Sequence, residues 1–503
     1  MAVDVVVVGG GPVGLLLAAE LRLAGVGAVV LEKRPDINPH SRAFRLQPRT
    51  LEILDARGLL DRFRKDNLMW PSAHFAGIKP LLNLAGLESE HPYSLLIPQA
   101  RTERLIEAHA RELGAEIRRG HEVVDLRQDD DTVTVQVREG DTEYELRADF
   151  LVGCDGGGST VRKLAGIEFP GTGGSVAALL GDVTIVEPEK LPSGVPGTMR
   201  TANGLLMAVA LEAPTTRVLT TEFGREHADR TAPVTLDELR ESILRVTGQE
   251  VRLRDPQWLS RFTDATRLAE KYRSGRILLA GDAAHVHFPI GAQGLNLGLQ
   301  DAMNLGWKLA AEVNGWAPKG LLDTYARERQ PVARAVLRET QAQLALMNPD
   351  ERINPLRELF GQLLALDAVN LFLSRLVSGT DVRYAFDPAD EADPLVGGYA
   401  PAIAIRTADG RGRVAELLRS GRGVLLVLGD LLEASALQGG WARRVEVVTA
   451  DPVDKPEVKA LLLRPDGHVV WAAPLDAVQE ETRTGLRQAL TTWFGAPDED
   501  GRG

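Results

Sequence analysis

The sequence of 503 residues contains a single cysteine, Cys154. One thiol cannot form a disulfide within the chain, and it excludes a zinc site built from several cysteines. No run reaches the ~18–20 uncharged apolar residues of a membrane span. The apolar start from Val3 to Val8 is interrupted by Gly9 and lacks the basic lead and cleavage site of a signal peptide. These absences predict a protein of the reducing cytoplasm that does not enter a membrane.

Positive charge is also in deficit. The chain has 58 Lys and Arg residues against 70 Asp and Glu residues, a formal charge of −12. This balance argues against nucleic acid as a partner. A composition of 44% hydrophobic and 25% charged residues is typical of a globular protein. Because a typical domain has ~100–200 residues, we expect at least two packed units.

The first thirty-two residues predict a strand–helix–strand unit. Val3 to Val8 is a β-branched run typical of a strand buried on both faces. A helical stretch rich in Leu and Ala follows from Leu15 to Ala24, and Gly25 ends it. A second strand, Ala28 to Leu31, then ends at Glu32.

Gly9-x-Gly11-x-x-Gly14 lies between the first strand and the helix, where a dinucleotide fingerprint belongs. The first glycine allows the tight turn, the second lets the backbone approach a pyrophosphate, and the third lets helix and strand pack closely. The helix N-terminus faces the phosphates with its partial positive charge. Glu32, at the end of the second strand, is placed to accept hydrogen bonds from a ribose. The motif alone does not say which dinucleotide is bound.

Later segments predict further helices and strands. We expect helices over Thr50–Phe63, residues 100–113, Leu236–Thr247 and Leu295–Val313, with helical sequence continuing to about 376. Strands are expected over 132–137, 144–151, 217–221 and 277–280, and over 424–428, 445–449 and 469–471 in a small C-terminal α/β unit. The chain therefore alternates strands and helices, as α/β proteins do.

Two more motifs place a carboxylate at the end of a predicted strand. They are Gly153-Cys154-Asp155-Gly156 and Ala280-Gly281-Asp282. Doubly wound sheets bind their ligands at this edge. With the fingerprint, these motifs resemble the single-component FAD-dependent aromatic hydroxylases, and above all the bacterial enzymes acting on aromatic polyketides and rifamycin-type antibiotics. The resemblance extends over essentially the whole chain, including Leu463 to Trp471.

The resemblance implies an α/β fold of three parts. A Rossmann-like FAD-binding domain would comprise residues 1–175 and 271–386, and a mixed-sheet substrate layer residues 176–270. A C-terminal thioredoxin-like domain would comprise residues 395–503, after a linker at Asp387 to Pro394. This last domain has no C-x-x-C motif, so it cannot perform dithiol chemistry and is left with packing or oligomer contact.

The resemblance also assigns contacts to FAD. Glu32 would hold the adenosine ribose and Asp282 the ribityl chain, while Asp155 would lie near the pyrophosphate. Leu295 and Asn296 would offer backbone groups to the flavin ring. The full expected set is Gly9, Gly11, Gly14, Glu32, Lys33, Arg42, Gln99, Val123, Asp155, Asp282, Gly294, Leu295 and Asn296.

The loop Pro289 to Gly294 supports a flavin site on physical grounds. It precedes the long helix, whose N-terminus would stabilise the anionic pyrimidine edge of reduced flavin by ~0.3–1 kcal/mol. The family often has glycine where this chain has Ala292. The added methyl group is expected to narrow the floor of the pocket or stiffen the loop.

Other candidate sites favour simpler interpretations. His285 and His287 lie two residues apart, but with no nearby cysteine or clustered acids we expect a structural role and no metal site. Cys154 is expected to be inert. Residues that could line a flat apolar substrate pocket are Trp70, Phe75, Met207, Phe288 and Pro289, although core packing is the more common role of such residues.

The prediction is an FAD-dependent monooxygenase. No second G-x-G-x-x-G follows a strand, which disfavours an enzyme that binds a second dinucleotide stably. The resemblance implies a transiently bound NADPH as reductant, and the choice between NADPH and NADH stays open. One oxygen atom passes from a C4a-hydroperoxyflavin to a polycyclic aromatic, polyketide-type substrate, with no side chain assigned as general base. Baeyer–Villiger oxidation, antibiotic-inactivating hydroxylation, drug sequestration by a flavoprotein without turnover, and an FAD-dependent reductase are the alternatives. Monomer and homodimer remain open.

Overall fold

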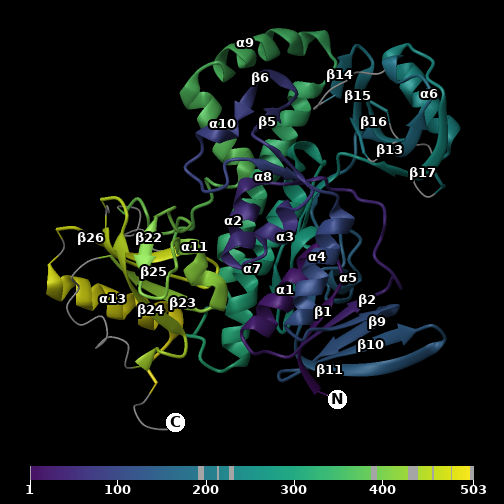
Figure 1. Cartoon of the computed structure of the whole chain (residues 1–503). Helices are drawn as coiled ribbons and strands as arrows, with labels where there is room; N and C mark the ends of the chain where they lie inside the picture. Colours follow the sequence, from purple (N-terminus) through teal and green to yellow (C-terminus); the bar gives the residue numbers. More distant parts are fainter. Residues whose placement is uncertain are drawn as a thin grey trace.

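The computed structural model describes residues 2–190, 197–211, 214–225, 232–386, 393–428, 440–455, 458–476 and 478–498. Most of the predicted linker, residues 387–392, lies outside these ranges. Three parts are visible in Figure 1: a central domain around one sheet, a second sheet with α6 at the upper right, and a C-terminal unit at the left.

The central sheet is mainly parallel. Its order is β19 (Arg273–Ser274), β20 (Ile277–Leu279), β11 (Thr142–Gly153), β1 (Ala2–Val8), β2 (Ala28–Glu32) and β8 (Glu116–Arg119). The pairs β1–β11, β1–β2, β2–β8 and β11–β20 are parallel. Two antiparallel strands, β9 (His121–Gln128) and β10 (Val133–Glu139), extend from β11. Val5, Val6 and Val7 are fully buried, as the β-branched run predicts. The predicted Rossmann-like α/β fold is confirmed.

Helices cover this sheet. They are α1 (Pro12–Leu23), α4 (Gln99–Glu112), α5 (Thr160–Leu164), α7 (Gln293–Val313) and α8 (Thr324–Met347). Helices α1 and α7 approach closely because Gly306 has no side chain: a Cβ there would lie 2.6 Å from the Cβ of Glu20. The helix predicted over Thr50–Phe63 is wrong in one respect. Two helices, α2 (Pro48–Ala56) and α3 (Leu60–Arg64), are separated by Gly58 at φ +68°, where a left-handed residue ends the first helix.

The second sheet is antiparallel and entirely between residues 176 and 262. Its order is β14 (Gly197–Thr201), β15 (Gly204–Ala210), β16 (Thr215–Phe223), β13 (Val176–Ile185) and β17 (Leu253–Phe262). Helix α6 (Leu236–Thr247) packs on one face through Leu239 and Ile243. The other face contributes Val176 and Leu205 to a core shared with Phe288, from the loop before α7. The sheet therefore forms a layer over that loop.

Smaller elements surround the space between the two sheets. A three-stranded sheet contains β3 (Arg45–Leu46), β7 (Ser94–Leu96) and β4 (Leu68–Trp70), and a hairpin contains β5 (Ser72–Phe75) and β6 (Ile78–Asn83). The hairpin packs against α9 (Asn354–Leu364) and α10 (Asp367–Ser378), at the top of Figure 1. Another short sheet contains β12 (Gly171–Thr172), β18 (Thr266–Leu268) and β21 (His285–Val286).

The C-terminal unit is a five-stranded mixed sheet with helices. Its order is β22 (Ile405–Thr407), β24 (Val445–Pro452), β23 (Gly423–Val427), β25 (Val458–Leu463) and β26 (Val469–Pro474). The β23–β24 pair is parallel, whereas β23–β25 and β25–β26 are antiparallel. Helices α11 (Val414–Leu417) and α13 (Gln479–Phe494) complete the thioredoxin-like arrangement.

Buried charges join this unit to the central domain. Arg464 is fully buried and donates to both carboxylate oxygens of Glu328 on α8, at 2.9 and 2.8 Å, and to Asp466. Arg57 forms a two-pronged pair with Glu20 and also donates to the carbonyl oxygen of Pro465. Separating the two units would leave these buried charges without partners, which is strongly unfavourable. The C-terminal unit is therefore expected to stay docked on the central domain.

Among the described residues, no single helix combines the length and apolar character needed to cross a membrane; one bent pair, Glu351–Leu364 with Asp367–Ser378, passes the test together.

Candidate cofactor-binding site

The motifs found in the sequence meet at one edge of the central sheet. Strands β20, β11, β1 and β2 are adjacent and parallel, so their carboxyl ends lie side by side. Backbone hydrogen bonds continue beyond the strands: Gly9 N–H donates to Leu31 at 2.8 Å, and Cys154 N–H donates to Val8 at 2.7 Å. The turns that carry the fingerprint, Asp155 and Asp282 are therefore neighbours.

The three fingerprint glycines meet different constraints. Gly9 has φ +111°, and a Cβ there would lie 2.4 Å from the carbonyl oxygen of Cys154. A Cβ at Gly14 would lie 2.1 Å from the carbonyl oxygen of Gly9. A Cβ at Gly11 would meet nothing within 4 Å. The chain itself thus requires the first and third glycines, while the second leaves open space at the N-terminus of α1, which has no side-chain cap. Pro12, the first residue of α1, has no N–H, so this space and the uncapped N–H groups of Val13 and Gly14 suit a pyrophosphate.

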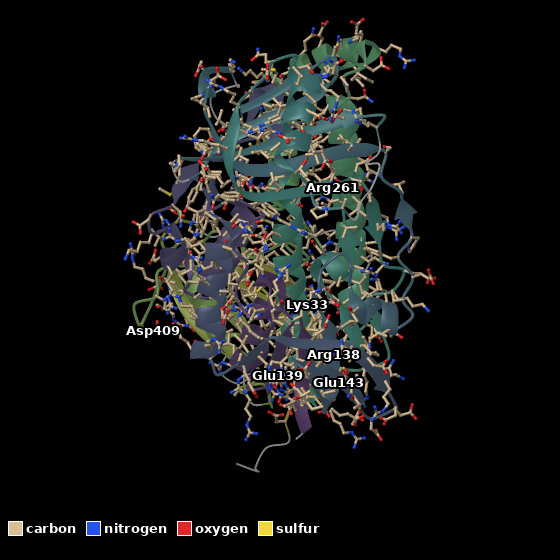
Figure 2. The ribbon with its side chains drawn as sticks, turned by 90° about the vertical axis from the view of Figure 1, so that its right-hand side faces the viewer. Lys33, Arg138, Glu139, Glu143, Arg261 and Asp409 are labelled. Carbon is tan, nitrogen blue, oxygen red and sulfur yellow. The ribbon has the colours of Figure 1, made fainter. Side chains whose placement is uncertain are left out.

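Glu32 is half-buried at the end of β2. Its carboxylate accepts hydrogen bonds from Gly10 N–H at 2.7 Å and Arg34 N–H at 2.9 Å. Each oxygen retains a lone pair that can accept from a ribose hydroxyl. Lys33 is exposed, and in the view of Figure 2 it lies between Arg261 of β17 and Arg138 of β10.

The neighbouring predicted contacts differ in what they can offer. Arg42 is exposed, in a loop tied to α4 because Gln99 Oε1 accepts from Ala43 N–H at 3.1 Å. Val123 is buried in the core of the central domain, so only its backbone is available to a ligand. The carboxylate of Asp155 accepts from Ser159 Oγ at 2.5 Å and from two N–H groups at the start of α5, at 2.6 and 3.1 Å. Asp155 therefore holds its own turn.

The other end of the site lies at the start of α7. Asp282 is exposed and makes no hydrogen bond within the described chain. Ala292 precedes α7 in the left-handed conformation, φ +55°, ψ +40°, and the helix has no side-chain cap. Left-handed backbone is where glycine is favoured, which explains the glycine of related chains at this place. Gly294 and Leu295, in the first turn of α7, are half-buried.

The side chain of Asn296 has a structural role, because both of its polar atoms are hydrogen-bonded within the chain. Its Oδ1 accepts from Gln47 N–H at 2.8 Å and Thr50 Oγ at 2.7 Å, and its Nδ2 donates to two carbonyl oxygens, of Arg45 and Ala292. Only its backbone N–H remains for a ligand.

Asp301 and Arg329 support the turn that carries Asp282, and sequence reasoning missed them. Asp301 is fully buried; it accepts from Gly281 N–H at 3.1 Å and pairs with His285 at 2.7 Å and with Arg329 at 2.7 Å. Burial alone would raise the pKa of Asp301, but Arg329 and His285 hold it below its usual value. His285 is thus committed to a carboxylate. The signal available in the sequence was Asp301 itself, a charged residue within the apolar part of the predicted helix, which indicates a buried partner.

One cation, Arg45, lies on the strand whose backbone is bonded to Asn296 of α7. Arg45 donates to the carbonyl of Ser72 at 3.3 Å and, within the described chain, belongs to no ion pair. Burial lowers its pKa to about 10. Burial and then Arg45 lower the pKa of His74 to about 4, so His74 is neutral at pH 7. A desolvated guanidinium and a helix N-terminus together favour an anionic ligand atom here.

The predicted apolar pocket residues divide into two groups. Phe75 and Phe288 are buried, and their rings contact Phe360 and Phe262 at centroid distances of 5.3 and 5.6 Å. These two are core residues. Further members of the predicted set are more accessible: Trp70 on β4 and Met207 on β15 are half-buried, and Pro289 is exposed.

The second sheet contacts the loop that carries Arg42. Arg217 on β16 forms a buried two-pronged pair with Asp182, both bonds being 2.7 Å, and donates to the carbonyl oxygen of Arg42 at 3.4 Å. Its guanidinium lies over the ring of Phe44, 4.5 Å from the centroid. Nothing in the local sequence identified this pair, which lies within the second sheet, or the bond from Arg217 to Arg42, which joins the sheet to the loop.

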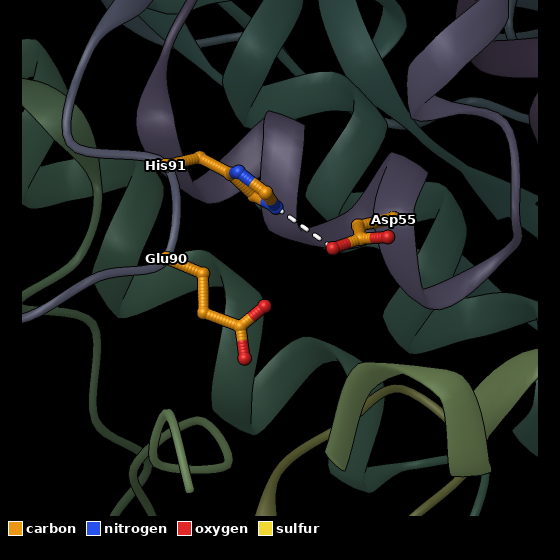
Figure 3. A group of neighbouring side chains, drawn as sticks. All are labelled: Asp55, Glu90 and His91. Atoms are coloured by element: carbon orange, nitrogen blue, oxygen red, sulfur yellow. Dashed lines mark hydrogen bonds and ion pairs between the residues drawn. The ribbon is translucent and has the colours of Figure 1, made fainter. Parts of the chain in front are cut away.

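A cluster of Asp55, Glu90 and His91 has ligand atoms within 4.8 Å of one another, as metal sites do (Figure 3). His91 Nε2 lies 2.8 Å from Asp55, and Arg413 donates to Asp55 and, at 2.6 Å, to Glu90. Burial opposes ionisation of Asp55, but these hydrogen bonds lower its pKa well below the usual range. The guanidinium of Arg413 already donates to both carboxylates, so the cluster joins α2 to the C-terminal unit.

Cys154 is not set up as a nucleophile, because burial raises the pKa of its thiol.

The open edge fits FAD along its whole length. Space at Gly11 and the start of α1 suits the pyrophosphate, Glu32 suits a ribose, and exposed Asp282 suits a hydroxylated chain. The uncapped start of α7 then suits the electron-rich edge of a flavin.

Comparisons with known proteins extend over the same regions. A family model described as an FAD-binding domain matches residues 2–340, and one described as the C-terminal part of aromatic-ring hydroxylases matches residues 393–497. The chain is 44% identical to 12-dehydrotetracycline 5-monooxygenase/anhydrotetracycline 6-monooxygenase of Streptomyces rimosus, over 99% of this chain and 100% of the relative. Rifampicin monooxygenase of Streptomyces venezuelae is also 44% identical, over 98% and 99%. The solved structure of the anhydrotetracycline hydroxylase OxyS from Streptomyces rimosus superposes with a TM-score of 0.92, covering 99% and 100% of the two chains.

Proposed function

Since the chain belongs to the family of FAD-dependent aromatic-ring hydroxylases, as its motifs predict, we propose that it is a monooxygenase of polycyclic aromatic, polyketide-type natural products. The reaction inserts one atom of O₂ into the substrate and releases the other as water, with NADPH as the electron donor. One observation carries this proposal: α1 and α7 both begin at the same edge of the sheet, and neither has a side-chain cap. Glu32 and Asp282 lie at that edge as well.

We propose the following contacts to FAD. Glu32 binds the adenosine ribose, the N–H groups behind Gly11 bind the pyrophosphate, and Asp282 binds the ribityl hydroxyls. The N–H groups of Leu295 and Asn296 bind the flavin ring. Further contacts come from Gly9, Gly14, Lys33, Arg42, Gln99, Val123 and Gly294, with Asp155 shaping its turn.

Bound FAD supplies electron transfer from NADPH and activation of O₂. The protein's own part is to position the reactants, exclude water and stabilise negative charge. The α7 N-terminus and Arg45 supply the positive potential. The second sheet, packed over the loop before α7, covers the site from one side and leaves Met207 half-buried.

The substrate class rests on the relatives and on this layer. Both named relatives align over nearly the full length, and their names assign them tetracycline-type and rifamycin-type substrates. An antibiotic-inactivating hydroxylation is the second candidate, because the rifampicin monooxygenase is as similar as the tetracycline enzyme.

The first experiment measures NADPH oxidation by the FAD-loaded protein in air, with a panel of polycyclic phenols, quinones and rifampicin. Products are examined by mass spectrometry under ¹⁸O₂. Substrate-stimulated oxidation with one labelled oxygen in the product supports a monooxygenase. Tight binding without stimulation favours a sequestering flavoprotein, and stimulation without label favours a reductase. NMR of the product separates hydroxylation from Baeyer–Villiger insertion, and loss of antibacterial activity identifies inactivation.

A matched pair of variants tests the cofactor site. Asp282→Ala should lower FAD affinity without changing the stability of the apoprotein, because this side chain makes no hydrogen bond within the described chain. Asp141→Ala, also exposed, lies in the turn between β10 and β11 and should change neither quantity.

We also propose the domain division into residues 1–175 with 271–386, 176–270 and 395–503, and a cytoplasmic monomer or homodimer. The division is supported by the central, second and C-terminal sheets, because the strands of each come from one of these domains, although the short sheet pairs β18 of the middle range with β12 and β21 of the first domain. Light scattering after size-exclusion chromatography would distinguish monomer from homodimer.

A further inference from the structure

A groove of about 260 Å³ lies between α7, α8 and α10. It is bordered by Gln293 and Leu297 of α7, Val336 and Glu339 of α8, Leu376 of α10, and Asp381 just beyond α10. In Figure 1, α8 runs from α7 towards α10. An apolar cavity of about 150 Å³ holds benzene, so this volume admits one aromatic ring with a short side chain.

One buried polar side chain that borders the groove has no partner among the described residues. Gln293 is 5% exposed, and neither its Nε2 nor its Oε1 has a hydrogen-bond partner among the described residues. Because buried side-chain amides are nearly always hydrogen-bonded, this pattern points to a ligand or ordered solvent in the groove.

The groove is bordered by two carboxyl groups, those of Glu339 and Asp381. Glu339 Oε2 is buried and unpartnered, and neither Glu339 nor Asp381 forms an ion pair within the described chain. Arg383, also at the groove, donates instead to the carbonyl oxygens of Asp393 and Pro394. The groove therefore offers two carboxyl groups to a ligand, and Glu339 becomes a carboxylate when a bound cation displaces its proton.

We propose that this groove is a second small-molecule site, which binds an organic ammonium ion with an apolar body of about one aromatic ring. The ammonium group donates to Glu339 and to Gln293 Oε1, and the apolar body packs against Leu297, Val336 and Leu376. The site does not depend on the monooxygenase reaction, so its test stands whether or not the proposed function holds.

Phenethylammonium and its neutral counterpart 2-phenylethanol are titrated into the FAD-loaded protein by calorimetry. Phenethylammonium should bind about tenfold more tightly or better, the effect of one charge-assisted hydrogen bond. Glu339→Gln should remove that advantage and leave the affinity for 2-phenylethanol unchanged. Glu358→Gln, the same change on exposed α9, is the control and should alter neither affinity.

A second variant tests the location. Ala335 also borders the groove, and Ala335→Phe should fill it and abolish binding of both probes while FAD content stays the same. Equal affinities for the two probes would overturn the proposal. So would unchanged binding to Ala335→Phe, because the probes would then occupy another place.

Proton release gives an independent measurement. Burial and then Asp381 raise the pKa of Glu339 to about 8; Arg338 opposes this. Glu339 is therefore mostly protonated at pH 7 in the free groove, and a bound cation should expel that proton. Calorimetry in two buffers of different ionisation enthalpy should show this release in the native protein and none in Glu339→Gln.

Discussion

Replacing Gly11 by alanine should separate cofactor binding from folding. Gly11 has φ −78° and ψ 176°, an extended conformation that alanine adopts without strain. The added methyl group would meet no protein atom within 4 Å. It would instead occupy the space in which we place the pyrophosphate of FAD.

The expected magnitudes follow from these two facts. Stability of the apoprotein should change by no more than about 1 kcal/mol, because the loss of an N-cap glycine and the gain in backbone stiffness are both small and opposed. FAD affinity should fall by about tenfold to a hundredfold, or about 1.4–2.8 kcal/mol, since the backbone no longer approaches the phosphates closely. Gly14→Ala should behave differently. Its methyl group would lie 2.1 Å from the carbonyl oxygen of Gly9, so overpacking should destabilise the fold itself by about 1–3 kcal/mol or more.

The assay compares both variants with the native protein. Thermal unfolding of the apoproteins gives the stability difference, and quenching of flavin fluorescence on titration with apoprotein gives the FAD dissociation constant. Gly173→Ala, in the loop between β12 and β13, is the control, because its added methyl group also meets nothing within 4 Å. The reasoning is refuted if Gly11→Ala binds FAD within about threefold of the native affinity while folding normally.

Three further changes have definite expected outcomes. Ala292→Gly should raise the stability of the protein by up to about 1 kcal/mol, because it relieves a left-handed alanine; a lower unfolding temperature would contradict this. Arg464→Met should destabilise the protein by about 3–5 kcal/mol and release the C-terminal unit to trypsin, because it leaves two buried carboxylates short of a cation; unchanged melting and digestion would count against it. Glu339→Gln should become relatively more stable as pH rises from about 5 to about 8. The pKa of the Glu339 carboxyl is 4.5 in the unfolded chain and about 8 in the folded protein, so the stability that its protonated form contributes is lost as pH rises between these values. The loss is roughly 1–2 kcal/mol after solvent screening. An equal stability difference between variant and native protein at both pH values would disprove the assignment.

Local signals in the sequence were sufficient for several elements. The helix predicted at Leu236–Thr247 has those bounds in the structure, because Thr235 caps its first turn and Gly248 ends it with φ +69°. The strand–helix–strand unit around the fingerprint also follows from apolar period and glycine placement. Other elements escaped. Strand β25 (Val458–Leu463) has no alternation to identify it, because its last residues are buried on both faces.

The sequence by itself determined that a dinucleotide-binding edge exists and which family the chain joins. A fingerprint works within about thirty residues, where strand, turn and helix are neighbours along the chain. Only the tertiary structure decided which side chains support that edge and which charged groups lie beside it. Asp301 and Arg329 are 28 residues apart in the sequence, and Arg217 reaches the loop of Arg42 across 175 residues. Gln293 and Glu339 border one groove only because α7 and α8 pack together. Each of these contacts depends on how distant segments pack together, and no local period or motif records that arrangement.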